Sequence, residues 1–106
     1  MINEAYFDVA TQAIRAYSLE TKKFESLHTT IQESATRAAG AATRWCQESV
    51  LILDGVQLRG SLKVHLVITD RWYDTFREAA TKLSSAAGRQ LEVRDCVYLL
   101  LDSFLP

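Results

Sequence analysis

Histidine and cysteine are the residue types here that most often take part in catalysis or metal binding, and the chain has two of each. His28 and His65 lie far apart, and neither is spaced from Cys46 or Cys96 as zinc ligands are. The sequence also lacks a Gly-x-Ser-x-Gly turn, a Cys-His signature and a phosphate-binding glycine loop. We therefore expect no metal site, no cofactor and no enzymatic activity.

The two cysteines fall in apolar patterns with helical spacing. This placement is typical of buried, reduced thiols, and a disulfide between Cys46 and Cys96 is the alternative. The chain has no charged-then-apolar leader and no apolar run of about 18 residues. We expect a cytoplasmic protein with no membrane partner.

Five basic residues in the second half of the chain are candidates for one basic patch: Arg59, Lys63, Arg71, Arg89 and Arg94. The alternative is a set of solvated charges that Asp70, Glu92 and Asp95 neutralise. The net charge of −1 gives no basic surplus, although nucleic-acid-binding proteins usually carry one.

The first third of the chain has helical periodicity. Asn3 is placed to cap a helix that begins at Glu4, and its apolar stripe is Phe7, Ala10, Ile14 and Tyr17. The polar stretch 18–23 (SLETKK) predicts a turn, or else a bend in one long helix, because no Gly or Pro enforces a break.

Residues 24–45 predict a long helix with a heptad seam formed by Phe24, Leu27, Ile31, Ser34, Ala38, Ala41 and Trp45. The small residues at its centre allow close helix packing, and Gly40 indicates that something packs against it. We favour an antiparallel helical hairpin within one core over an intermolecular coiled coil. Trp45 closes that core or anchors an interface.

The middle of the chain predicts β-structure. Asp54-Gly55 is a two-residue turn signal between the apolar runs of residues 50–59. Residues 62–69 (LKVHLVIT) begin with clean alternation of apolar and polar side chains, which is the period of a half-buried strand. These runs form a small meander or a ribbon with one free edge.

Two helices follow in the prediction. Thr69 or Asp70 caps the first, which ends near Gly88, and the second runs from about Glu92 to Phe104. The second is apolar nearly all round, so we expect its extra apolar side to face another copy or another protein. The expected fold is α+β and mostly α, as one domain over residues 1–106. Its parts are a helical hairpin (1–49), a β-ribbon (50–69) and a helix pair (70–106).

The segments LKVHLVITD, RWYDTFREAA, GRQLEV and RDCVYLLL together resemble the ribbon-helix-helix family of DNA-binding proteins, over residues 61–106. The resemblance implies a homodimer whose paired strands enter the major groove of double-stranded DNA. By this resemblance the groove-facing positions are Ser61, Lys63, His65 and Val67. Arg59 and Arg94 would contact phosphates.

Two functions follow from these patterns. The first is a dimeric ribbon-helix-helix DNA-binding protein, such as a repressor, an antitoxin-like regulator or a plasmid accessory factor. The alternative is a non-enzymatic interaction module, such as an immunity, inhibitor or adaptor protein, that acts through its helical hairpin or its last helix. The candidate partner or dimer interface consists of Val97, Leu100, Leu101, Phe104 and Trp45.

Overall fold

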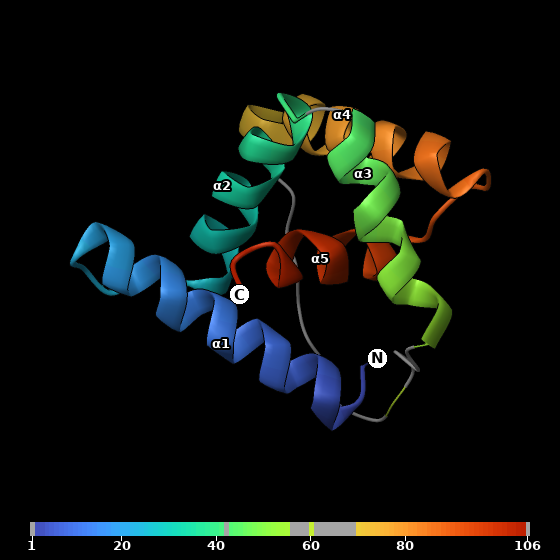
Figure 1. The fold of residues 1–106 in the computed structure, drawn as a ribbon. Helices are drawn as coiled ribbons and strands as arrows, with labels where there is room; N and C mark the ends of the chain where they lie inside the picture. The colour runs from blue at the N-terminus through green and yellow to red at the C-terminus, as the bar shows by residue number, and fades with distance from the viewer. Residues whose placement is uncertain (1, 42, 56–59, 61–69, 106) are drawn as a thin grey trace.

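The computed structural model describes residues 2–41, 43–55, 60 and 70–105. The helices are α1 (Glu4–Thr21), α2 (Leu27–Ala39), α3 (Thr43–Val50), α4 (Asp70–Ala87) and α5 (Val93–Asp102), with a 3-10 turn η1 (Leu51–Gly55) after α3. Figure 1 shows α5 in the middle of the molecule, with α1 below it and α4 above. The described residues contain no strand, so the fold is all-α and the α+β prediction is wrong.

The ribbon-helix-helix resemblance is also wrong, because the residues that the structure describes are nearly all helical and contain no strand. Residues 50–55, expected to form the first strand and turn of a hairpin, instead finish α3 and make η1. A short apolar run such as Leu51–Leu53 fits a strand or a buried helical turn equally well, and periodicity alone does not separate the two. The predicted strand 62–69 lies outside the described residues.

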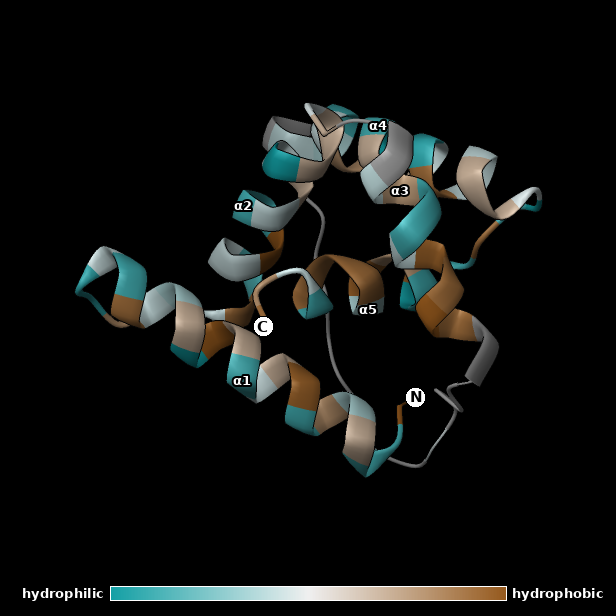
Figure 2. Ribbon diagram, viewed as in Figure 1, coloured by the Kyte–Doolittle hydropathy of each residue, from teal (hydrophilic) through white to brown (hydrophobic). Residues whose placement is uncertain are grey.

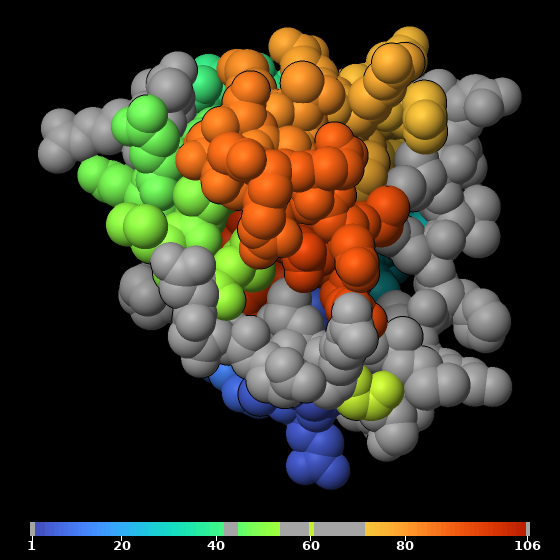
Figure 3. All heavy atoms as spheres, turned by 90° about the vertical axis from the view of Figure 1, so that its right-hand side faces the viewer, coloured from blue at the N-terminus to red at the C-terminus, as the bar shows by residue number. Residues whose placement is uncertain are grey.

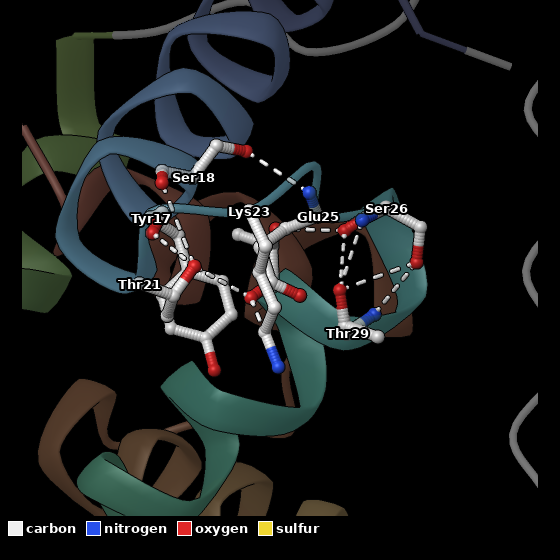
Figure 4. Close-up of polar contacts among 8 residues, drawn as sticks. Tyr17, Ser18, Thr21, Lys23, Glu25, Ser26 and Thr29 are labelled. Atoms are coloured by element: carbon white, nitrogen blue, oxygen red, sulfur yellow. Dashed lines mark hydrogen bonds and ion pairs between the residues drawn. The ribbon is translucent and has the colours of Figure 1, made fainter.

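The turn between α1 and α2 shows why the first helix ends where it does. Lys22 adopts the left-handed conformation (φ 63°), and its N–H donates to the carbonyl of Ser18 at 2.9 Å. Figure 4 shows the polar contacts that hold this turn, among them the Thr21 hydroxyl donating to the Glu25 carboxylate at 2.7 Å. Ser26 and Thr29 then exchange side-chain and backbone hydrogen bonds as a capping box for α2. A break between the two helices is therefore present, but it lies later than predicted, because residues 18–21 still belong to α1 and the turn begins at Lys22.

The long helix expected over residues 24–45 is divided in two. α2 ends at Ala39, Gly40 is its C-cap, and α3 begins at Thr43. Gly40 is exposed, and a side chain there would meet no atom closer than the Arg37 carbonyl oxygen, at 3.9 Å. Among the described residues, nothing therefore packs tightly against Gly40, and the glycine ends the helix.

Three other predicted helix boundaries are found close to their expected positions, whereas the predicted cap at Thr69 or Asp70 falls on residues whose side chains the structure does not describe and the last helix ends at Asp102. The side chain of Asn3 accepts a hydrogen bond from the Tyr6 N–H at 2.9 Å and so caps α1. Gly88 follows α4 with φ at 72°, a left-handed conformation that glycine adopts without strain. The Glu92 N–H donates to the Asp95 carboxylate at 3.3 Å in the first turn of α5.

The core is built around α5, which packs on α1, α2 and α4. All six residues from Cys96 to Leu101 are buried, and Leu100 and Leu101 have no exposed surface. Figure 2 shows brown, apolar colour along the middle of α5, whereas brown and teal residues alternate along α1. Small side chains on α2, such as Ala35 and Ala38, are buried and allow close approach. The apolar side of α5 is thus largely covered by its own chain.

α3 packs along α4, as the adjoining green and orange surfaces in Figure 3 show. Lys82 of α4 reaches across to α2, where its ammonium group donates to the carbonyl oxygens of Ala39 (2.5 Å) and Ala41 (3.3 Å). A cation at the end of a helix satisfies free carbonyls and the negative end of the helix dipole. None of the described helices has the combined length and apolar character needed to cross a membrane.

We expect Lys82→Met to lower the free energy of unfolding by about 1–3 kcal/mol, because two carbonyls at the end of α2 lose a charged donor. Urea unfolding followed by circular dichroism measures this difference. The matched control is Lys23→Met, whose ammonium lies 4.0 Å from Glu25 and is 71% exposed. The control should change stability by less than about 0.5 kcal/mol. Equal effects of the two substitutions would contradict a capping role for Lys82.

Gly60 lies against the first residues of the chain. A side chain built at Gly60 would collide with the backbone of Ile2 and Asn3. Ile2 is buried and Asn3 caps α1, so this contact fixes where α1 begins.

We expect Gly60→Ala to destabilise the protein by about 1–3 kcal/mol, as overpacking usually does. Gly40→Ala is the control, because Gly40 has φ −95° and open space around its Cα. It should be neutral or stabilising by up to about 1 kcal/mol. Thermal unfolding of both variants tests the contact, and a harmless Gly60→Ala would rule it out.

Candidate functional site

An apolar cleft runs between α1 and α5 and has a volume of about 550 Å³. One wall is formed by Phe7, Thr11 and Ile14, which follow one another at helical spacing along α1. The opposite wall is formed by Val93, Val97 and Leu101, four residues apart along α5. The floor consists of Tyr6, Ala10, Leu27 and Ile31. Volumes in this range are typical of ligand-binding or peptide-binding sites.

The two lips of the cleft carry apolar side chains that the chain leaves in water. Phe7 is 50% exposed on the α1 lip, and Val93 is 55% exposed on the α5 lip. Single exposed apolar residues are common on protein surfaces. Here, however, two of them flank the same apolar cleft, and a shared apolar patch of this kind marks an interaction site more often than a lone residue does.

Tyr6 holds the floor of the cleft to the α5 wall. Its hydroxyl donates to the carbonyl oxygen of Arg94 at 2.7 Å, and its ring lies 5.0 Å from the ring of Tyr98. Burial raises the pKa of the Tyr6 phenol well above its usual value, and the Asp95 carboxylate raises it further. The phenol therefore remains a neutral hydrogen-bond donor at physiological pH.

The charged residues at the α5 lip are paired with each other. The Arg94 guanidinium donates to the Glu92 carboxylate at 3.0 Å, with the two side chains 23% and 62% exposed. The described lining holds no histidine, cysteine or serine. The polar groups that line the cleft are the Tyr6 and Thr11 hydroxyls and the Glu92–Arg94 pair, and most of its remaining lining is apolar. The cleft therefore offers mainly shape and apolar surface for binding.

The residues predicted from the sequence as a site are not brought together in one place. Val97, Leu101 and Arg94 line the cleft, and Leu100 is buried in the core. Phe104 is half-buried, packs against the Tyr17 ring at 5.4 Å and lies under the Arg37 guanidinium at 5.0 Å. Trp45 is half-buried beside Arg37 and Ser103. The DNA-reading positions Arg59, Ser61, Lys63, His65 and Val67 lie outside the described residues.

Sequence reasoning missed the α1 wall of the cleft. It placed Phe7 and Ile14 in the apolar stripe of the first helix but not in a binding surface, whereas in the structure both residues line the cleft and Phe7 is half exposed. The available signal was the width of the apolar face of α1, which spans Tyr6, Phe7, Val9, Ala10, Ala13, Ile14 and Tyr17. One neighbouring helix does not cover a face this wide.

Both thiols are buried, and burial favours the protonated, less nucleophilic form. Cys96 is 1% exposed, and burial raises its pKa to about 11, with the Asp95 carboxylate adding to the effect. Burial also raises the pKa of Cys46, and Lys82 partly opposes that shift. Both are free thiols. Among the residues that the structure describes, no three His, Cys, Asp or Glu side chains form a group that could hold a metal ion.

We expect Tyr6→Phe to lower the free energy of unfolding at neutral pH by about 1 kcal/mol through the lost hydrogen bond. Because the folded-state pKa of Tyr6 is raised, its contribution is fully present below the ordinary tyrosine pKa of about 10. The contribution is lost as pH rises above that value, at up to about 1.4 kcal/mol per pH unit. Tyr6→Phe should therefore lose stability less steeply than the wild-type protein in alkali.

Denaturant unfolding in mildly alkaline and strongly alkaline buffers measures these slopes. Tyr73→Phe is the control, because Tyr73 is 48% exposed on α4 and its substitution should leave the wild-type pH slope unchanged. Identical slopes for Tyr6→Phe and the wild-type protein would show that Tyr6 is not the buried titrating group.

Comparison of this chain with protein-family models, with curated proteins and with solved structures gives no match.

Proposed function

We propose that the protein is a non-enzymatic protein-interaction module whose docking surface is the α1–α5 cleft. The observation that carries the proposal is that two half-exposed apolar residues, Phe7 and Val93, stand on opposite lips of one apolar cleft. Water contact at these side chains costs free energy that a docked apolar surface would recover, at about 25 cal/mol per Å².

The shape of the cleft favours an amphipathic helix as the docked element. Its walls are two helices, and each contributes apolar residues three or four positions apart. The apolar face of a helix repeats with the same period, and helix-in-groove recognition uses anchors at these positions. The small Ala10 on the floor leaves room for such anchors.

The proposal also names the cellular compartment. The two buried cysteines are free thiols, which supports a reducing compartment such as the cytoplasm.

Site-specific photo-crosslinking tests the docking surface. A benzophenone amino acid replaces Phe7 in one variant and Leu19 in another, since both residues lie on α1 and are about equally exposed, at 50% and 54%. Leu19 does not line the cleft. In the protein's own cells, light should join position 7, but not position 19, to a peptide from an amphipathic helix.

A Val93→Glu substitution on the opposite lip supplies the second control. It places a charge beside the docked apolar face and should remove the position-7 adduct while circular dichroism shows the helices unchanged. Adducts that form equally at positions 7 and 19, or that survive Val93→Glu, would exclude the cleft as the docking surface.

A further inference from the structure

We infer that the occupant of the cleft is a second copy of this chain, docked about a two-fold axis that passes near Thr11. This inference rests on the proposed docking role of the cleft and names the partner. In the dimer the two clefts face each other, so that α1 and α5 of both copies form a four-helix layer. The exposed lips of each copy then become the centre of an apolar core.

The charges on α1 support a second copy as the partner. The exposed face of the helix carries Glu4 and Asp8 in its first half and Arg15 in its second half. None of these three side chains takes part in a salt bridge within the part of the chain that the structure describes, and Asp8 accepts only a hydrogen bond from Gln12, at 2.7 Å. Glu20, near the end of the helix, is already paired with Arg37 at 2.7 Å. The remaining charges around Thr11, which are Asp8 before it and Arg15 after it, are complementary to those of an antiparallel copy of the helix.

The spacing of residues along α1 fits the same symmetry. Phe7 and Asp8 precede Thr11 by four and three residues, and Ile14 and Arg15 follow it by three and four. An antiparallel pair of α1 helices centred on Thr11 sets Phe7 beside Ile14 of the second copy. It also sets Asp8 beside Arg15 of the second copy. In both pairs the offset along the helix axis is no more than one residue's rise, about 1.5 Å.

The faces of α1 agree with this pairing as well. Phe7, Thr11 and Ile14 all line the cleft, so they share the side of α1 that faces it. Asp8 and Arg15 are seven residues apart and therefore share a neighbouring, exposed side. Apolar residues consequently meet apolar residues in the middle of the dimer, and opposite charges meet at its edge.

Sedimentation equilibrium over a concentration series tests the dimer. The wild-type protein should approach twice the chain mass of 11.9 kDa. Phe7→Ala should weaken the dimer by about thirtyfold, as expected for truncation of a central aromatic anchor. Leu19→Ala, an exposed change on the same helix, should leave the dissociation constant unchanged.

A charge-swap series keeps the test independent of folding defects, because Asp8 and Arg15 are both exposed. Asp8→Arg alone and Arg15→Asp alone should each weaken the dimer by about fivefold. The double variant Asp8→Arg with Arg15→Asp should restore the wild-type constant, since an antiparallel pair then regains both ion pairs. Only a partner that carries the same reversed charges gives this rescue.

The outcomes separate the inference from the proposed function. A monomer at every concentration, a dimer indifferent to Phe7→Ala, or a double variant without rescue would each overturn the second-copy inference. If the position-7 crosslink then joins an amphipathic helix of another protein, the docking role of the cleft stands without the dimer. If position 7 gives no selective crosslink either, both proposals fail.

Discussion

The burial of the middle of α5, from Cys96 to Leu101, is the constraint on which the rest of the structure depends. These six consecutive residues cover all sides of the helix, so water must be largely excluded around this stretch, although Val93 in the first turn stays half exposed. A helix of ten residues has too few hydrogen bonds to be stable alone, and its stability must come from its neighbours. α1, α2 and α4 supply that cover from different directions, which explains an arrangement with α5 at the centre.

The cleft is a consequence of how α1 covers α5. The Tyr6 hydroxyl must reach the Arg94 carbonyl, and this bond sets the distance between the two helices at the start of α5. The next residue of α1 on that face is Ala10, which is buried but too small to fill the space beside Val97. A long side chain next to a short one therefore leaves the helices joined at one end and separated by an apolar groove along their length.

Much of the helical framework could be predicted from local signals. Asn3, the polar stretch 18–23 and Gly88 each act on the backbone within a few residues, so their effects are readable without the tertiary fold. Two errors had non-local or ambiguous causes. Gly40 could sit in a packed helix or end one, and only the absence of a neighbour decides between them. The apolar run 51–53 fits a strand as well as a helical turn, and the predicted hairpin followed from that choice. The resemblance to the DNA-binding family followed from the alternation in residues 62–69, which is a local pattern that many folds share. For the cleft, sequence reasoning named Val97 and Leu101 of the α5 wall as candidate interface residues. It did not find the α1 wall, because that wall depends on how far apart α1 and α5 pack.

The exposure of Phe7 and Val93 gains meaning from the packing elsewhere on the same helices. Ala13 of α1 and Leu100 of α5 have no exposed surface, so these helices bury side chains completely where the chain provides a neighbour. A larger residue at Ala10 would fill the groove and add buried apolar area, a change of a kind that commonly raises stability. The chain instead has the small Ala10 on the floor of the cleft and the exposed apolar residues Phe7 and Val93 on its lips. Within one copy, neither the unfilled groove nor the exposed apolar surface is compensated. Stability of the isolated fold does not account for that combination, whereas a partner surface that enters the groove removes both costs at once.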